Sequence, residues 1–238
     1  MPLIKGRQAV HESLLAKQKP HRIMICHEHR GSQGLSEILE LAKRFSIPIQ
    51  RLDRQQFVRL ADDKHQQVLA HMPELRLLSL RELIAKSPPL IVILDHIEDP
   101  HNMGAIFRSC EALGHPFVIF PKHRSSPIGT GSIRSSAGAI WHLNLCQVSN
   151  ISQSLRELKK KGYWIYAASE HEGTSLTHVD LCQPAVLLLG NEHKGISPIH
   201  KKMVDFFIEI PLSGQVSSLN VSVAAGIILY TFSNQRIS

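Results

Sequence analysis

The sequence has no long hydrophobic runs. None of its 238 residues lie in an apolar stretch near the roughly 18 residues that suggest a membrane-spanning helix. The first ten residues include Lys5 and Arg7 but no apolar core behind them, which is unlike a secretory signal peptide. We therefore expect a cytoplasmic protein with no membrane partner.

Cysteine is also scarce. The four cysteines include no Cys-x-x-Cys pair, so the sequence predicts neither a zinc site nor a dithiol redox site of the usual spacing. No spacing of carboxylates beside the histidines marks another metal site, and we expect no metal. The cysteines are expected to be buried thiols: Cys26, Cys110, Cys146 and Cys182.

The remaining composition is ordinary, except for the distribution of charge. With 43% hydrophobic residues, 14 Gly and 13 Pro, the chain is neither disordered nor collagenous. Residues 1–90 hold 15 Lys and Arg against 9 Asp and Glu, whereas residues 91–238 hold 12 against 11. A basic first part beside a nearly neutral second part indicates a polyanion partner, with a merely solvated basic face as the alternative.

The hydrophobic pattern divides the chain into two α/β units. In the first, helices are expected near residues 6–17 and 35–45, with strands at 22–26 and 47–52. Prolines at both ends of residues 73–89, around a short helix at 80–85, are typical of a linker. We expect a small N-terminal domain at residues 1–75, a linker at 76–89 and a second domain at 90–238.

The second unit alternates short apolar runs with amphipathic stretches. Such runs suit strands buried on both faces of a parallel sheet. Strands are expected at residues 90–94, 117–120, 163–168, 185–189 and 206–210, and helices at 105–113, 151–161, 198–204 and 219–232. Ligands of such sheets bind beyond the carboxyl ends of the strands, so the loops at these ends are candidate sites.

Three of these loops carry chemically useful residues. After strand 90–94, Asn102 lies where it could cap the next helix, Gly104 permits close backbone approach, and Arg108 lies one turn further. After strand 185–189, Gly190 and Gly195 bracket Glu192 in a predicted tight turn. After strand 206–210, Ser218 and Asn220 precede a helix of small residues that could pack closely. Each loop alone also fits a capped or tightly packed element without catalysis.

Together the three loops resemble a known enzyme family. The patterns Asp-x-x-x-Asp-Pro-x-Asn-x-Gly-x-x-x-Arg, Leu-Gly-Asn-Glu-x-x-Gly and Ile-Pro-Leu followed by Ser-Leu-Asn-Val-Ser-Val-Ala are similar to the motifs of the SpoU (TrmH) family of RNA ribose 2′-O-methyltransferases, in the SPOUT superfamily. The resemblance covers residues 90–232. It implies S-adenosylmethionine as cofactor, a trefoil knot in the parallel-sheet domain, and a homodimer with active sites at the subunit interface.

The resemblance also implies roles for individual residues. The catalytic set is Asn102, Arg108, Glu192, Ser218 and Asn220. The cofactor-binding set is Leu189, Gly190, Asn191, Gly195, Ile210, Leu212 and Leu219. In the family Arg108 is assigned to activation of the ribose hydroxyl, but a guanidinium stays protonated, so holding a phosphate and stabilising a developing oxyanion is its safer physical role.

The start of the chain carries a second resemblance. Residues 5–12, Lys-Gly-Arg-Gln-Ala-Val-His-Glu, are similar to the ribosomal-protein-like (L30e-like) RNA-binding extension of members that modify a guanosine of 23S ribosomal RNA. Arg7 and Arg134 are candidate RNA contacts. Ribosomal RNA is the favoured substrate, transfer RNA is the alternative, and a non-catalytic RNA-binding or assembly factor is a third reading. Residues 64–68 depart from the usual His-Gln-Gly-Val, because Gln67 replaces the glycine.

Overall fold

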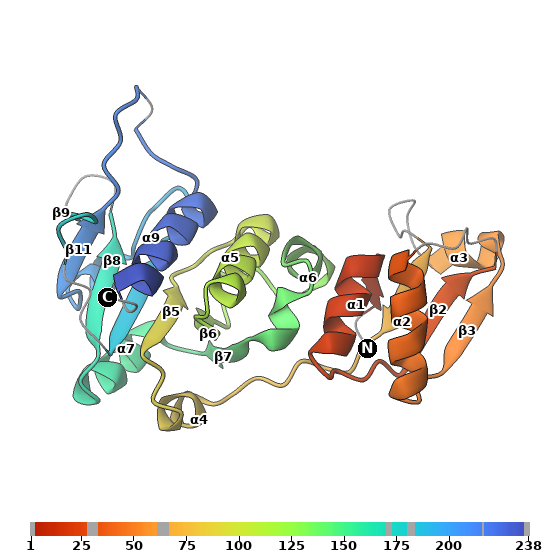
Figure 1. The fold of residues 1–238 in the computed structure, drawn as a ribbon. Helices are drawn as coiled ribbons and strands as arrows, with labels where there is room; N and C mark the ends of the chain where they lie inside the picture. Colours follow the sequence, from red (N-terminus) through yellow and green to blue (C-terminus); the bar gives the residue numbers. More distant parts are fainter. Residues whose placement is uncertain are drawn as a thin grey trace.

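The computed structural model describes residues 3–27, 33–60, 67–169, 173–179, 184–215 and 217–235. These residues form two units, each built on one β-sheet, that lie side by side and are joined by an extended segment that carries helix α4 (Leu80–Ala85) (Figure 1). Ser79 and Glu82 cap α4 reciprocally, which explains a helix of only six residues at the expected place. In the described ranges no helix combines the length and apolarity needed to cross a membrane.

The first sheet is mixed and has four strands. Its order is β1 (Leu3–Lys5), β4 (Val68–His71), β2 (Arg22–Cys26) and β3 (Ile49–Leu52), with only the β2–β3 pair parallel. Its helices are α1 (Arg7–Leu15), α2 (Gln33–Arg44) and α3 (Arg54–Leu60). The expected apolar stripe of α2 is buried at Leu35, Ile38 and Ala42. Strands β1 and β4 and helix α3 escaped sequence analysis because they are short and show no clear period.

Gln67 stands at the turn into β4 with a left-handed backbone. Its φ is +63°, a conformation that glycine adopts without cost and that most other residues avoid. The Gln67 carbonyl accepts a hydrogen bond from the backbone N–H of Cys26, at 3.2 Å, so the turn joins β4 to β2. The glutamine therefore keeps a backbone geometry that suits glycine. Residues 64–66, which precede it in the same segment, lie outside the described residues.

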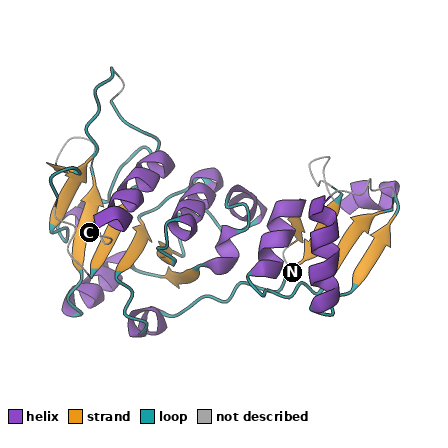
Figure 2. Cartoon of the chain, in the orientation of Figure 1, coloured by secondary structure: helices purple, strands orange, loops and turns teal. Residues whose placement is uncertain are grey.

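The second sheet has seven strands and is entirely parallel. Its order is β7-β6-β5-β10-β8-β11-β9, and each neighbouring pair is parallel. Figure 2 colours the strands orange and the helices around them purple. The strands are β5 (Leu90–Leu94), β6 (Phe117–Pro121), β7 (Asn144–Val148), β8 (Trp164–Ala168), β9 (Thr174–Ser175), β10 (Ala185–Leu189) and β11 (Phe206–Glu209). The expected α/β fold with a parallel sheet is confirmed. Strands β7 and β9 were not expected.

Helices cover both faces of this sheet, which explains why its central strands are apolar throughout. All five residues of β5 and of β10 are buried. In β5, Ile91 and Ile93 pack in the core with Leu155 of α7 (Ile151–Lys160), whereas Val92 and Leu94 pack in the core with Phe107 of α5 (Pro100–Ala112). Each such buried side chain contributes about 1.5–3 kcal/mol to stability.

Two helices differ from the sequence expectation in ways that matter for the site. Helix α5 begins at Pro100, five residues before the expected start, and α9 spans Val221–Gln235. We expected the small residues of α9 to allow close packing. At Gly226 a side chain would fit, because a Cβ there would lie an ordinary 3.6 Å from Ser109 Oγ. The remaining helical segments are α6 (Thr130–Ser135), the 3-10 helix η1 (Ala139–His142) and α8 (Pro198–Lys201).

The two sheets are linked by helix packing as well as by the connecting segment. Helix α1 lies against η1, and α6 lies against β1 (Figure 1). Gly138, just before η1, has φ +93°, and a Cβ on it would overlap Glu12 Cβ on α1. His142 Nε2 lies 3.6 Å from Glu12 Oε2. This junction therefore depends on a position where only glycine fits.

Three of the four cysteines are buried thiols outside any disulfide: Cys26, Cys110 and Cys146. Burial raises the pKa of Cys110, and burial followed by the charge of Glu82 raises the pKa of Cys146 to about 11. Both are therefore unreactive thiols at neutral pH. Cys182 lies outside the described residues.

Candidate functional site

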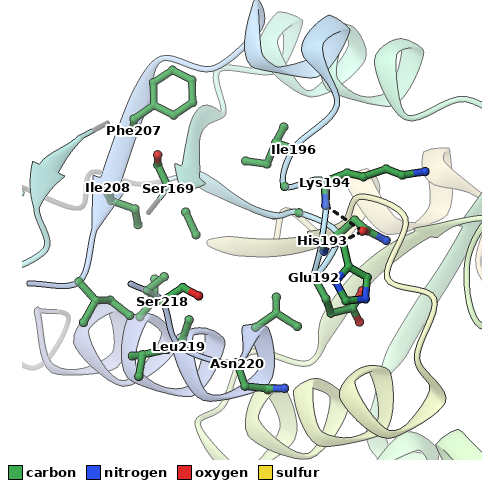
Figure 3. A pocket seen from close by; sticks show the side chains of 18 of the residues that line it. Ser169, Glu192, His193, Lys194, Ile196, Phe207, Ile208, Ser218, Leu219 and Asn220 are labelled. Carbon is green, nitrogen blue, oxygen red and sulfur yellow. Dashed lines mark hydrogen bonds between the residues drawn. The ribbon is translucent and has the colours of Figure 1, made fainter. Parts of the chain in front are cut away.

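A cavity of about 540 Å³ opens beyond the carboxyl ends of β8, β10 and β11. Figure 3 shows Glu192 and His193 on one side of it, Phe207 and Ile208 on another, and residues 218–220 at the start of α9. The residues of the predicted sets that line it are Gly190, Asn191, Glu192, Gly195, Ile210, Leu212, Ser218, Leu219 and Asn220. Loops widely separated in sequence therefore meet around one cavity, as ligand sites of parallel sheets do.

Three predicted residues do not line the cavity: Leu189, Asn102 and Arg108. Leu189 is fully buried at the end of β10, directly before the turn that lines the cavity. Asn102 reaches the site through hydrogen bonds. Arg108 is exposed on α5, and among the described residues it makes no hydrogen bond or ion pair.

Helix α5 is capped by Asp99, which corrects the expectation that Asn102 could act as the cap. The Asp99 side chain accepts a hydrogen bond from the backbone N–H of His101 at 2.9 Å, and Pro100 occupies the first turn. Asn102 is thereby placed inside the helix with its side-chain amide unused by the backbone. Gly104 permits close approach, as expected, but the neighbour is α6, since a Cβ there would lie 2.5 Å from Ser135 Cβ.

A chain of side-chain hydrogen bonds joins the three loops. Asn220 Nδ2 donates to Asn102 Oδ1 at 3.0 Å, and Asn102 Nδ2 donates to Glu192 Oε1 at 3.0 Å. The Asn220 oxygen accepts from the backbone N–H of Ser222 at 2.9 Å and from its hydroxyl at 2.6 Å. The side-chain amides of Asn102 and Asn220 therefore each donate one hydrogen bond and accept at least one. The structure brings Asn102, Glu192 and Asn220 together, as their common assignment predicts.

The turn after β10 is as tight as its two glycines indicate. Asn191 and Gly195 exchange backbone hydrogen bonds of 3.0 and 2.9 Å, and Gly195 has φ +63°. A Cβ on Gly190 would overlap the carbonyl carbon of Gly195 and would lie 2.5 Å from the Ile196 nitrogen. The Asn191 side chain accepts from the backbone N–H of residues 193 and 194 (Figure 3). The backbone of the turn is thus fixed, and it forms one wall of the cavity.

Asp95 holds the far end of this turn and was missed as a site residue, although it opens the first motif. It is fully buried at the end of β5. Its carboxylate accepts from the backbone N–H of Ser197 at 2.8 Å, from the Ser197 hydroxyl at 3.3 Å and from His200 Nδ1 at 2.8 Å. Burial opposes ionisation, but the bonds from His200 and Ser197 outweigh it and lower the pKa of Asp95. A buried carboxylate therefore ties the turn to β5.

His96 is a second residue at the site that the sequence analysis did not single out. Its φ of +61° is left-handed, and its ring Nδ1 lies 3.0 Å from the carbonyl oxygen of Arg124. Its own carbonyl accepts from Asn191 Nδ2 at 2.8 Å. His96 therefore joins the loops after β5, β6 and β10. The folded chain alone assembles the other cavity residues outside the predicted sets, which are Ala168, Ser169, His193, Lys194, Ile196, Lys201, Phe207, Ile208, Ser217, Val221, Ala224 and Ile228.

The two candidate RNA contacts lie on elements near the junction of the units. Arg7 begins α1 directly after β1, and Arg134 is exposed on α6, which packs against β1. Helix α6 also packs on α5, where Ser135 Oγ lies 3.0 Å from His101 Nδ1. The two arginines thus lie on elements at the junction of the two units. Within the described ranges no cluster of side chains suits a metal ion.

Comparison with known proteins identifies the family. The model of the SpoU rRNA Methylase family matches residues 89–230, and the model for RNA 2′-O ribose methyltransferase substrate binding matches residues 3–78. The 23S rRNA (guanosine-2′-O-)-methyltransferase RlmB of Coxiella burnetii is 34% identical over 244 residues, covering 99% of this chain and 98% of that protein.

Two further similarities span nearly the whole chain. The putative TrmH family tRNA/rRNA methyltransferase YacO of Bacillus subtilis is 32% identical over 236 residues, covering 97% of this chain and 94% of that protein. The crystal structure of the SpoU methyltransferase AviRb of Streptomyces viridochromogenes, in complex with AdoMet, matches with a TM-score of 0.82 and 25% identity, covering 99% of this chain and 90% of AviRb. This chain belongs to the SpoU family of RNA methyltransferases.

Proposed function

We propose that the enzyme methylates the 2′-hydroxyl of a ribose in RNA, and that its substrate is a guanosine of 23S ribosomal RNA. The observation that carries this proposal is the hydrogen-bonded chain from Asn220 through Asn102 to Glu192, which joins three loops beside one cavity. Polar side chains held in place beside a cavity suit a reaction in which two bound molecules must be oriented.

S-adenosylmethionine is the cofactor, and it supplies an activated methyl group. The cavity fits such a molecule, because about 540 Å³ is within the range of small-molecule sites. Apolar side chains of Ile196, Phe207 and Leu219 face an adenosine-sized space, and the turn at residues 190–195 offers backbone groups. A molecule without phosphate needs no phosphate-binding loop, which agrees with the lack of one. The predicted cofactor set, with Leu189 supporting the turn, provides this wall.

The remaining assigned residues act on the RNA. Holding the ribose oxygen near the methyl carbon contributes about 7–11 kcal/mol to lowering the barrier. Arg108 is exposed and unpaired among the described residues, so its guanidinium is available to hold the phosphate beside the target ribose and to stabilise the developing oxyanion. Ser218, which lines the cavity, and Asn220 orient the same sugar. The Arg108→Lys variant keeps the charge but loses the fork, and should lose most turnover; near-normal turnover would refute this assignment.

The first unit supports ribosomal RNA as the substrate. Residues 1–75 form the substrate-binding domain of the proposal, residues 76–89 the linker and residues 90–238 the methyltransferase domain. The L30e-like character of the first domain is an inference from its opening residues and its basic excess. The Coxiella burnetii relative, whose name specifies 23S rRNA, aligns over both units. The enzyme and its RNA would meet in the cytoplasm.

Incubation with each RNA and a tritiated methyl donor tests the substrate. We expect label in 23S ribosomal RNA, in the ribose of a guanosine; label confined to transfer RNA would support the alternative substrate instead. Calorimetry with S-adenosylmethionine separates both from a non-catalytic assembly factor, which has no need of the cofactor. The joined side chains Asn102, Glu192 and Asn220 favour a working enzyme over a decayed one.

The homodimer of the proposal uses the outer face of α9. Val223, Ile227 and Tyr230 are exposed by 50, 39 and 57%, and they recur at helical spacing on one stripe beside the cavity. A twofold contact through this stripe would place the exposed Arg108 of α5, which packs against α9, at the subunit interface. Light scattering should show a dimer for the wild-type protein and a monomer for the Tyr230→Glu variant. A wild-type protein that is itself monomeric would refute the dimer.

The trefoil knot is the last part of the proposal. Its support is the strand order, in which β10 lies between β5 and β8. After β11 the chain continues to α9, which packs against α5. In the proposed knot the segments around the cavity would cross one another, unlike the usual unknotted connections of parallel sheets.

A further inference from the structure

The proposed reaction needs a group that takes the proton of the ribose hydroxyl. The family resemblance associates Arg108 with activation of that hydroxyl, but the role proposed above for Arg108 is to hold the phosphate. Arg108 is unsuitable, because a guanidinium stays protonated and has no acceptor atom. The lysines that line the cavity, Lys194 and Lys201, carry ammonium groups, which donate hydrogen bonds and have no acceptor atom. The hydroxyls of Ser217 and Ser218 are poor bases. Among the described residues that line the cavity, the bases that remain are Glu192 and His193.

The hydrogen-bond chain distinguishes these two candidates. The Asn220 oxygen is occupied by Ser222, so the Asn220 amide must donate to the oxygen of Asn102. The amide nitrogen of Asn102 is thereby turned towards Glu192, to which it donates at 3.0 Å. Glu192 must accept at this oxygen. The donors in this chain therefore all point towards Glu192, whose carboxylate accepts the last hydrogen bond.

The hydrogen bond from Asn102 orients Glu192 and occupies only one of its two carboxylate oxygens. In the part of the chain that the structure describes, its side chain receives one hydrogen bond, at Oε1, and Oε2 has no protein partner. The side chain is half-buried, and it lines the cavity. His193 is exposed, and its ring makes no hydrogen bond among the same residues. An oriented carboxylate with one free oxygen is the better placed base, because geometry precedes basicity in general-base catalysis.

We infer that Glu192 is the catalytic proton acceptor of the methyl transfer, an inference that rests on the proposed function. The ribose 2′ oxygen forms a bond to the methyl carbon while the carbon–sulfur bond breaks, its electron pair remaining on sulfur. The O–H bond of the ribose breaks, and its proton moves to Glu192 Oε2. The cationic sulfonium becomes a neutral thioether, the anionic carboxylate becomes a neutral acid, and the proton is later released to water.

The surroundings of Glu192 favour this transfer. Asn102 donates to the carboxylate and is itself fixed from behind by Asn220, so the free oxygen keeps its direction during the reaction. The titratable groups nearby are His193 and Lys194 on the same turn, Lys201 at the end of α8, and His101 on α5, which pairs with Ser135.

The Glu192→Gln variant tests the inference. Its side-chain amide oxygen can still accept the hydrogen bond from Asn102, but the amide cannot take a proton. We expect the single-turnover rate to fall about 100- to 10,000-fold, the usual contribution of a general base. The dissociation constant of S-adenosylmethionine, measured by calorimetry, should stay within about twofold of wild type, and the melting temperature should be unchanged. The conservative Glu192→Asp variant should retain a measurable part of the rate.

The controls separate a proton acceptor from a merely charged or structural residue. Glu98→Gln removes the same charge from an exposed position in the loop after β5 and should keep the wild-type rate. The wild-type rate should fall on acidification with unit slope, and Glu192→Gln should lose this acid limb. The inference is overturned if Glu192→Gln keeps more than about a tenth of the rate, or if His193→Asn removes the acid limb instead. A wild-type protein that methylates no RNA ribose would overturn the proposed function itself.

Discussion

Replacing Gly190 by alanine tests whether the tight turn after β10 forms the cofactor wall. The added Cβ would overlap the Gly195 carbonyl carbon and would lie 2.5 Å from the Ile196 nitrogen and 2.8 Å from the Gly195 oxygen. All three are backbone atoms that cannot rotate away. Relief requires opening of the turn, with loss of the 3.0 and 2.9 Å bonds between Asn191 and Gly195. Overpacking of this kind costs about 1–3 kcal/mol.

Part or all of that cost should appear in cofactor binding, because the opened turn must close again around the ligand. At 1.4 kcal/mol per tenfold, the dissociation constant should rise about 5- to 150-fold. Isothermal titration calorimetry with S-adenosylmethionine measures it. Gly214→Ala is the matched control in the loop after β11, since nothing lies within 4 Å of its added Cβ and its φ is not left-handed. A Gly190→Ala variant that binds the cofactor as wild type does would refute the assignment of this turn.

Three other substitutions test the structure around the site. Gln67→Gly should raise the free energy of unfolding by up to about 1 kcal/mol, because relief of the left-handed strain at φ +63° exceeds the entropy cost of glycine; urea unfolding that shows a loss would contradict this. Asp95→Asn should cost about 1–3 kcal/mol at pH 7. Since the folded pKa of Asp95 is lowered, the wild-type advantage should persist above about pH 4, the unfolded carboxyl range, and disappear as pH falls through the folded value, as followed by urea unfolding at several pH values. Gly138→Ala should lower the melting temperature more than Gly162→Ala, because both have left-handed φ but only position 138 would clash, with Glu12; equal losses would exclude that contact.

Local patterns predicted most of the second unit. Strands β5 and β10 were delimited to the residue because they are continuous apolar runs between turn residues, which is the usual signature of buried parallel strands. The turn at residues 190–195 was predicted because two glycines allow its geometry. By contrast, β7 carries polar Asn144 and Gln147 and gave no comparable run. The start of α5 was misplaced because both Asp99 and Asn102 are good caps, and only the fold decides between them.

The parts of the site that escaped prediction are contacts between distant segments. Asp95 and His200 are 105 positions apart, and their 2.8 Å bond exists only because β5 and β10 are neighbours in the sheet. A histidine on a short helix carries no sign in the sequence of the carboxylate that it will meet. The orientation of Asn102 is of the same kind, since it is fixed by Asn220, 118 positions away. Motif residues thus tell which side chains meet, but the direction of each hydrogen bond, and with it the choice of Glu192 as proton acceptor, follows only from the folded arrangement.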